Sequence, residues 1–165
     1  MTKLIKLGFG AAAFVLLSST VSAQQTATAS VTATANVAPK ARLDVTGSVT
    51  FADADPDVTP ILSAAALDIS VKARTGNAET VTLTVAADGD FEEAVSGATI
   101  GIANLTWIAS GTGFAPGTAA ITDVTLGTWT GSGNRTGTQT YRLANSWAYD
   151  TGTYSVTLTY TLTAP

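Results

Sequence analysis

Residues 154–163 have the sequence YSVTLTYTLT, in which bulky apolar and small hydroxyl-bearing side chains alternate throughout. Successive side chains of a β-strand point to opposite faces, so this alternation predicts a strand with one face buried and the other in water. Residues 150–152 (DTG) supply a turn before it. The face predicted to be buried comprises Tyr154, Val156, Leu158, Tyr160 and Leu162.

The same period of two recurs upstream of this strand. Residues 43–51, 67–74 and 79–86 alternate apolar and polar side chains, and we predict a strand in each. Residues 75–78 (TGNA) are expected to connect the second and third of these strands as a hairpin. Turn-forming residues recur about every ten positions, and no stretch after the N-terminus has the spacing of an amphipathic helix. We therefore predict an all-β fold, an antiparallel immunoglobulin-like β-sandwich of about seven or eight strands.

The alternation changes parity between Ile102 and Leu105, which predicts a bulge or short turn near residues 103–104. Trp107 follows this point, and Trp129 ends a further predicted strand over residues 121–129. Both tryptophans are expected to fill the core, because the other side chains available to it are mostly small.

The first 23 residues differ from the rest of the chain. Lys3 and Lys6 precede an apolar run over residues 7–17, and Val21 and Ala23 occupy the positions that signal peptidase reads. The run is well short of the roughly 20 residues that cross a bilayer as a helix. We predict a signal peptide over residues 1–23, and hence a secreted, cell-surface or periplasmic protein with no transmembrane anchor after cleavage.

Residues 24–38 form a β-patterned extension ahead of the predicted sandwich domain, residues 39–165. Its apolar side chains are small, so their burial contributes less free energy than the burial of Leu or Phe. Two interpretations stay open: the segment is the domain's own first strand, or it is a free extension that completes the sheet of a neighbouring copy. Its apolar face comprises Ala27, Ala29, Val31, Ala33, Ala35 and Val37.

The sequence contains no cysteine and no histidine. It lacks thiolate nucleophiles, imidazole bases and the usual ligands of zinc, copper and haem, so we expect no enzymatic activity. Loss of Lys3 and Lys6 with the signal peptide leaves six basic residues against twelve acidic ones, a net charge of −6. Such a chain repels nucleic acid, which argues against that class of partner.

Three aspartates, Asp53, Asp55 and Asp57, alternate in residues 53–57 (DADPD). Carboxylate oxygens are ligands that Ca²⁺ prefers, so this loop is a candidate calcium site. The EF-hand pattern is not met and Pro56 stiffens the loop, so a solvated acidic loop at the end of a strand is the alternative. No other cofactor is predicted.

Trp147 and Tyr149 lie in a polar segment, residues 145–149 (NSWAY). Flat aromatic rings pack well on sugar rings, so these two residues are candidate glycan contacts. Packing within the domain is the alternative for Trp147.

The order of these segments resembles that of chaperone–usher fimbrial subunits and their spore-coat-U-like relatives. Gly152 lies fourteenth from the C-terminus, where such subunits place a glycine before an alternating last strand. The resemblance implies a non-catalytic structural subunit of a fibre, assembled head-to-tail by β-strand addition with the help of a periplasmic chaperone. Two features depart from the family pattern: Ala164 stands at the penultimate position in place of Tyr, and there is no disulfide.

Residues 154–165 are also similar to the C-terminus of WxL cell-wall-binding domains, with Tyr160 in the position of the Trp in Trp-x-Leu. This resemblance implies an envelope-associated module that binds cell-wall glycan or another carbohydrate. The sequence therefore predicts a secreted structural subunit, with a wall-binding module as the alternative.

Overall fold

The computed structural model describes residues 25–165, so the predicted signal peptide lies outside the described residues. The chain divides into two compact units, Met1–Ala35 and Asn36–Pro165. Of the first unit, residues 25–35 are described: all are exposed and none belongs to a helix or strand. The second unit holds every strand of the described chain.

Twelve strands and one 3-10 turn make up the second unit, and residues 25–165 contain no α-helix. Their bounds are β1 (Lys40–Thr46), β2 (Ile61–Ser63), β3 (Leu67–Arg74), β4 (Thr80–Ala87), β5 (Phe91–Glu93), β6 (Thr99–Ile100), η1 (Ile102–Asn104), β7 (Leu105–Ser110), β8 (Gly117–Thr118), β9 (Val124–Thr130), β10 (Gly133–Ala144), β11 (Tyr154–Ser155) and β12 (Leu158–Thr163).

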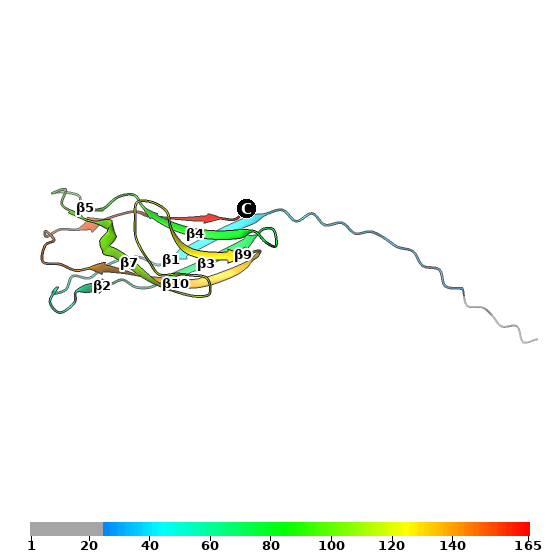
Figure 1. The fold of residues 1–165 in the computed structure, drawn as a ribbon, viewed down its shortest axis with the longest axis horizontal. Helices are drawn as coiled ribbons and strands as arrows, with labels where there is room; N and C mark the ends of the chain where they lie inside the picture. The colour runs from blue at the N-terminus through cyan, green and yellow to red at the C-terminus, as the bar shows by residue number, and fades with distance from the viewer. Residues whose placement is uncertain (1–24) are drawn as a thin grey trace, which may run out of the picture. The chain divides into compact units, whose positions relative to one another are not determined.

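The strands form two layers in which every paired strand runs antiparallel to its neighbour. One layer is a six-stranded sheet with the order β1-β3-β10-β7-β8, to which β2 is added beside β10. The other consists of two three-stranded sheets, β12-β4-β9 and β11-β5-β6. Figure 1 shows β4 and β12 lying above β3 and β10.

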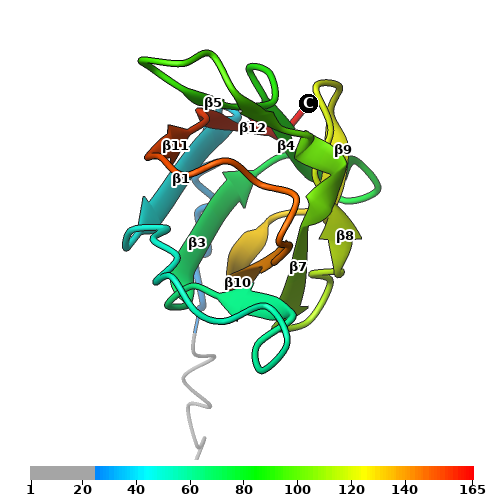
Figure 2. The same ribbon diagram turned by 90° about the vertical axis from the view of Figure 1, so that its left-hand side faces the viewer.

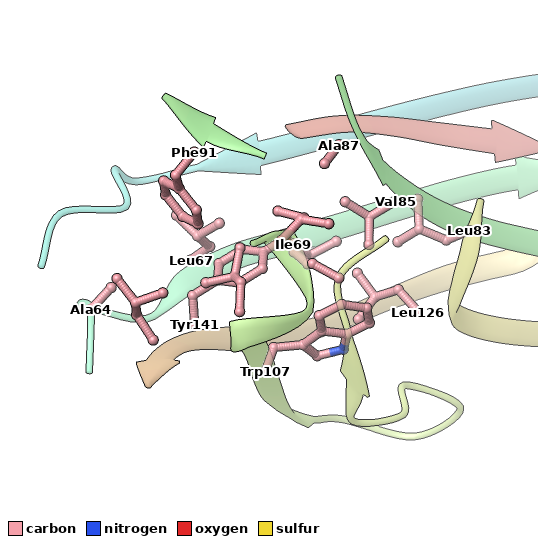
Figure 3. Close-up of a cluster of buried hydrophobic side chains, with 14 of the residues drawn as sticks. Ala64, Leu67, Ile69, Leu83, Val85, Ala87, Phe91, Trp107, Leu126 and Tyr141 are labelled. Carbon is pink, nitrogen blue, oxygen red and sulfur yellow. The ribbon is translucent and has the colours of Figure 1, made fainter. Parts of the chain in front are cut away.

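The core lies between the layers and is built by the alternation seen in the sequence. In β3, Leu67, Ile69 and Val71 are buried, and β4 buries every second residue in the same way. Figure 3 shows Leu67 and Ile69 of β3 and Leu83 and Val85 of β4 pointing into the space between the layers, together with Trp107 and Tyr141. The predicted fold class is therefore confirmed: an all-β, antiparallel sandwich. The predicted number of strands, about seven or eight, is too low, because several short pairings of two or three residues (β2, β5, β6, β8 and β11) form strands of their own.

Several local predictions are confirmed as well. A short turn, η1, occupies the point where the parity changes. Trp107 and Trp129 are both buried, and the indole nitrogen of each donates a hydrogen bond to a backbone carbonyl, that of Ala115 or Thr112.

The predicted hairpin at residues 75–78 is wrong. β3 pairs with β1 and β10, whereas β4 pairs with β9 and β12, so the connection crosses from one layer to the other. Alternation shows which face of each strand is buried. It does not show whether two consecutive strands lie side by side in one layer or in opposite layers, because both arrangements bury the same faces.

The first strand is shorter than predicted. The alternation over residues 43–51 predicts one strand, but β1 ends at Thr46 because Gly47 has a φ of 122°. That conformation is open to glycine and ends a regular strand. Val49 and Phe51 still pack against the core after the break.

Candidate functional site: an open seam and its cleft

The two layers are joined on one side of the sandwich and separate on the other. On the joined side, Phe114 forms a β-bridge with Gly127. The neighbouring backbone bonds, from Ala115 to Leu126 and from Thr128 to Gly113, tie the loop after β7 to β9. On the other side, β1 is the edge strand of one layer and β12 is the edge strand of the other.

No strand in residues 25–165 pairs with the outer edge of β1 or of β12. Some Cα atoms of the two strands lie within 8 Å of one another, yet no ladder of hydrogen bonds joins them in the described chain. Figure 2 shows β1 next to β12. We call this side of the molecule, between β1 and β12, the seam.

The apolar side chains along the seam are only half-buried, unlike those of the central strands. All of them pack against the core, but each keeps part of its surface in solvent. Exposed strand edges are normally covered or blunted, because they recruit other strands. On the side of β1 these side chains are Leu43, Val45, Val49 and Phe51. On the side of β11 and β12 they are Tyr154, Val156, Leu158, Tyr160, Leu162 and Ala164.

The backbone groups that β12 leaves free can be identified from its register. Thr157 continues the register beyond the strand: its carbonyl accepts the backbone N–H of Asp88 at 3.0 Å. Backbone groups alternate along an antiparallel strand, so Thr159 and Thr161 also face β4. The N–H and C=O groups of Leu158, Tyr160 and Leu162 therefore point to the open edge.

The last strand is interrupted between β11 and β12, and Asp88 forms hydrogen bonds with Thr157 at this interruption. Besides its backbone bond, Asp88 accepts the N–H of Thr157 on Oδ1 at 2.9 Å. Hydrogen bonds from the backbone and the side chain of Thr157 lower the pKa of the Asp88 carboxyl below its ordinary value. The side chain thus supplies the acceptor that a β4 carbonyl would provide in an unbroken ladder.

A cleft of about 950 Å³ continues the seam past the ends of β1 and β12. One wall is residues 49–56, which follow β1, and the other is residues 153–158, which contain β11. The floor is the end of the core, with Phe91, Ile100 and Leu105 among its residues. The space between the layers is therefore unfilled at this end.

The rim of the cleft carries both candidate glycan contacts. Trp147 is 70% exposed and Tyr149 is half-buried, and both line the cleft. Asn145 fixes the rim, because its Nδ2 donates to the carbonyls of Ala54 at 2.9 Å and Thr59 at 3.0 Å. The loop of the three aspartates is thereby attached to the end of β10.

The three aspartates of the candidate calcium site are exposed and do not converge. Asp53 and Asp55 line the cleft, and Oδ1 of Asp55 accepts the backbone N–H of Asp57 at 2.9 Å, within a turn. Across residues 25–165, no three His, Cys, Asp or Glu side chains are grouped as metal ligands would be.

Gly152 precedes β11 and packs on Glu93 of β5. A Cβ atom at Gly152 would lie 2.3 Å from Cγ of Glu93. Oε2 of Glu93 accepts the backbone N–H groups of Val95 and Ser96 and the Ser96 hydroxyl, which together lower the pKa of its carboxyl. The glycine leaves room for this buried carboxylate beneath the turn into the last strand.

A polar cluster inside the sandwich was not predicted. Gln139 is fully buried on β10, and its Oε1 accepts the hydroxyl of Tyr160 at 2.6 Å. The hydroxyls of Tyr160 and Tyr141 are 3.0 Å apart. One signal was available in the sequence: Gln139 shares the parity of Tyr141 and Leu143, so a polar residue directly precedes two apolar ones on the same face of the strand.

No protein-family model and no curated protein matches this sequence. In residues 25–165, none of the structure has the length and hydropathy of a membrane-crossing helix. The seam, the cleft and the N-terminal extension are the features of the described chain that bear on its function.

Proposed function

We propose that the protein is a secreted, non-catalytic structural subunit that assembles head-to-tail by β-strand addition. In this proposal, residues 26–37 of one copy enter the seam of the next and pair with the open edge of β12. The contact joins two different surfaces, so it propagates into a filament and does not close into a dimer.

The observation that carries the proposal is the seam itself. The outer edges of both of its strands, β1 and β12, are unpaired in the described chain, and the apolar side chains beneath them are half-buried. A strand laid along β12 would bond the free groups of Leu158, Tyr160 and Leu162 and cover those side chains. Backbone pairing supplies affinity, and alternate side chains supply the fit.

The extension matches the seam in period and length. It has six apolar side chains, one at every second position from Ala27 to Val37. The last strand likewise packs six apolar side chains against the core, at every second position from Tyr154 to Ala164. At about 3.3 Å per residue, residues 26–37 span about 40 Å and residues 154–164 about 36 Å. Residues 26–37 hold no strand of their own and are exposed, which leaves their backbone groups free to pair.

The small side chains of the extension suit the narrow part of the seam. Two strands that flank a third lie about 9.5 Å apart, so a seam with Cα atoms within 8 Å must widen to admit one. A face of alanine needs less widening than a face of leucine. The wider cleft, beside residues 153–158, is the place where insertion would begin.

The test compares two charged substitutions in the mature chain, which begins at residue 24. Val31→Asp places a carboxylate on the inserted face, whereas Thr32→Asp places it on the outer face one residue away. We expect Val31→Asp to abolish filaments in negative-stain images and Thr32→Asp to retain them. Equal behaviour of the two variants, or monomeric wild type, would refute strand addition.

A specific observation also supports a second function, glycan binding. Trp147 is 70% exposed at the mouth of a cleft that Tyr149 also lines. Tryptophan is enriched at binding interfaces, because its ring is large and apolar while its N–H can reach a partner. We expect retention on insoluble cell-wall material if this function holds, and its loss in Trp147→Ala. Retention unchanged by Trp147→Ala, or no retention of wild type, would refute it.

A further inference from the structure

We propose that successive copies also make an electrostatic contact, in which a basic surface at one end of the sandwich docks on the acidic rim of the next copy's cleft. This inference rests on the proposed head-to-tail assembly and adds a second interface to it. It specifies which ends of the two copies meet and in which direction the extension runs.

The basic surface lies on the outer face of β1 and β3. In the antiparallel register, Lys40 is opposite Arg74 and Arg42 is opposite Lys72, so four cations form a two-by-two array. All four are exposed, and within residues 25–165 only Arg42 forms an ion pair, with Asp44 at 2.8 Å. Like charges directly opposite each other destabilise a sheet, so an acidic partner would relieve a cost that the isolated copy bears.

The N-terminal extension leaves the sandwich at this basic end. Nε of Arg74 donates a hydrogen bond to the carbonyl of Ala38 at 2.8 Å, and β1 begins at Lys40. A copy that inserts its extension into a neighbour therefore brings the basic surface up to that neighbour.

The acidic rim lies at the other end of the molecule. Asp53, Asp55 and Asp150 line the cleft and are exposed, and Asp57 follows in the same loop. Asp88, Asp90 and Glu92 surround a neighbouring hollow beside residues 155–157. Most of the acidic residues of the described chain are thus gathered near the cleft.

The distance between the two surfaces follows from the length of β10, which runs from one surface to the other. Asn134 lies opposite Lys72 in the basic array, and Asn145 anchors the acidic loop just after the strand ends. Eleven residues of extended chain span about 36 Å. Charges so far apart are screened from each other in physiological salt, where the Debye length is about 8 Å. Apart from the Arg42–Asp44 ion pair, the basic surface therefore has no acidic complement from the rim of its own copy and finds it on another copy.

The direction of pairing brings the complementary ends together. Residues 154–163 run from the cleft towards the basic end of the sandwich. Thr163, at the end of β12, is opposite Thr82 near the start of β4, and β4 begins a few residues after Arg74 of the basic surface. An extension antiparallel to them has residue 37 at the cleft and residue 27 at the far end. Its own sandwich then lies against the cleft, with Lys40 and Arg74 facing the acidic rim. A parallel insertion would place the two basic ends together.

The test is a charge swap in the mature chain. One variant, Asp53→Lys/Asp150→Lys, inverts two of the rim's charges, and the other, Lys40→Glu/Lys72→Glu, inverts two of the four charges of the basic surface. These positions spare the Arg42–Asp44 ion pair, the Arg74–Ala38 bond and the turn at Asp55. Each variant alone loses the charge attraction and sets like charges against each other at the exchanged positions, whereas junctions between the two variants set opposite charges against each other at those positions.

We expect each variant alone to assemble at least about tenfold more slowly than wild type by light scattering at low salt. An equimolar mixture should recover to within about threefold and incorporate both variants. A control, Asp68→Lys/Asp123→Lys, makes the same change in net charge as the rim variant at residues that line neither the cleft nor the neighbouring hollow, and should assemble like wild type. Circular dichroism melts would establish that all variants fold.

Wild-type rates for both variants, or a mixture no faster than its components, would overturn the electrostatic contact. The outcome is separable from that of strand addition. If Val31→Asp blocks assembly while the charge swaps change nothing, strand addition stands and this contact is wrong. If wild type forms no filaments, both are wrong.

Discussion

The hydroxyl of Tyr160 lies 2.6 Å from Oε1 of Gln139, so a hydrogen bond crosses the sandwich from β12 in one layer to β10 in the other. Gln139 is fully buried, and Tyr141 adds a second hydroxyl 3.0 Å from that of Tyr160. The outer strand of the seam is thus fixed from within by a side chain. Its outer backbone groups stay free to receive another strand.

Removing this bond should destabilise the fold. In Tyr160→Phe, the buried Oε1 of Gln139 loses the partner seen here, and an unsatisfied buried polar group costs about 1–3 kcal/mol. Tyr154→Phe is the matched control, because its hydroxyl bonds the exposed backbone carbonyl of Asp150. Urea unfolding should show the larger loss for Tyr160→Phe. Equal losses would show that the buried bond contributes no more than an exposed one.

The same cluster predicts a limit to stability at alkaline pH. Burial is the main cause that raises the pKa of both Tyr141 and Tyr160 above the ordinary value of 10.0. A raised folded pKa means that stability is complete below pH 10 and falls as the pH rises above it. We expect the melting temperature to fall above pH 10, and less steeply in Tyr160→Phe. Identical slopes in the two proteins would contradict this coupling.

The glycine before the last strand should tolerate no side chain. Gly152→Ala sets a methyl group 2.3 Å from Cγ of Glu93, and relieving such a clash in a packed site costs about 1–3 kcal/mol. Gly89→Ala is the control, since no atom lies within 4 Å of the added Cβ there. Chemical denaturation should separate the two variants. A loss of stability no larger in Gly152→Ala than in Gly89→Ala would show that Glu93 moves aside freely.

Sequence alternation was sufficient to predict which residues of β3, β4 and the last strand face inward. It could not give the layer to which each strand belongs, because that depends on partners far away in the chain. The hairpin predicted at residues 75–78 failed for this reason: β3 and β4 have compatible patterns but lie in different layers.

The candidate site was only partly predictable for a related reason. The apolar face of the last strand and the extension are visible in the sequence, so both halves of the proposed contact could be named. The cleft could not, because its walls come from residues 49–56 and 145–158 and meet only in the folded chain. The bond from Tyr160 to Gln139 likewise joins positions whose neighbours give no sign of the pairing.

Acid should weaken the hold of Asp88 on the last strand. The lowered pKa means that its stabilising effect is present above the unfolded value of 3.8 and is lost as the pH falls through the folded value. Asp88→Asn should lower the melting temperature at neutral pH and flatten its dependence on pH below about 4. Calorimetry between pH 2 and 7 would measure both effects, and an unchanged dependence would show that Asp88 does not contribute.

Disulfide trapping would determine the strand to which the extension pairs. The chain has no cysteine, so introduced pairs report without interference. If residue 37 lies opposite residue 154, Thr32 lies opposite Thr159, whose backbone groups face β4. That pair is of the closer, non-hydrogen-bonded kind, with Cα atoms about 4.5 Å apart, which a disulfide can bridge.

We expect Thr32→Cys/Thr159→Cys to give a ladder of disulfide-linked oligomers on non-reducing gels. Thr32→Cys/Thr163→Cys shifts one partner by four residues, about 13 Å, and should give little cross-linking. A cross-linked monomer in place of the ladder would mean that the extension is the domain's own strand, which fills the seam in the same copy. Equal ladders from both variants would mean that the extension does not hold one register on β12.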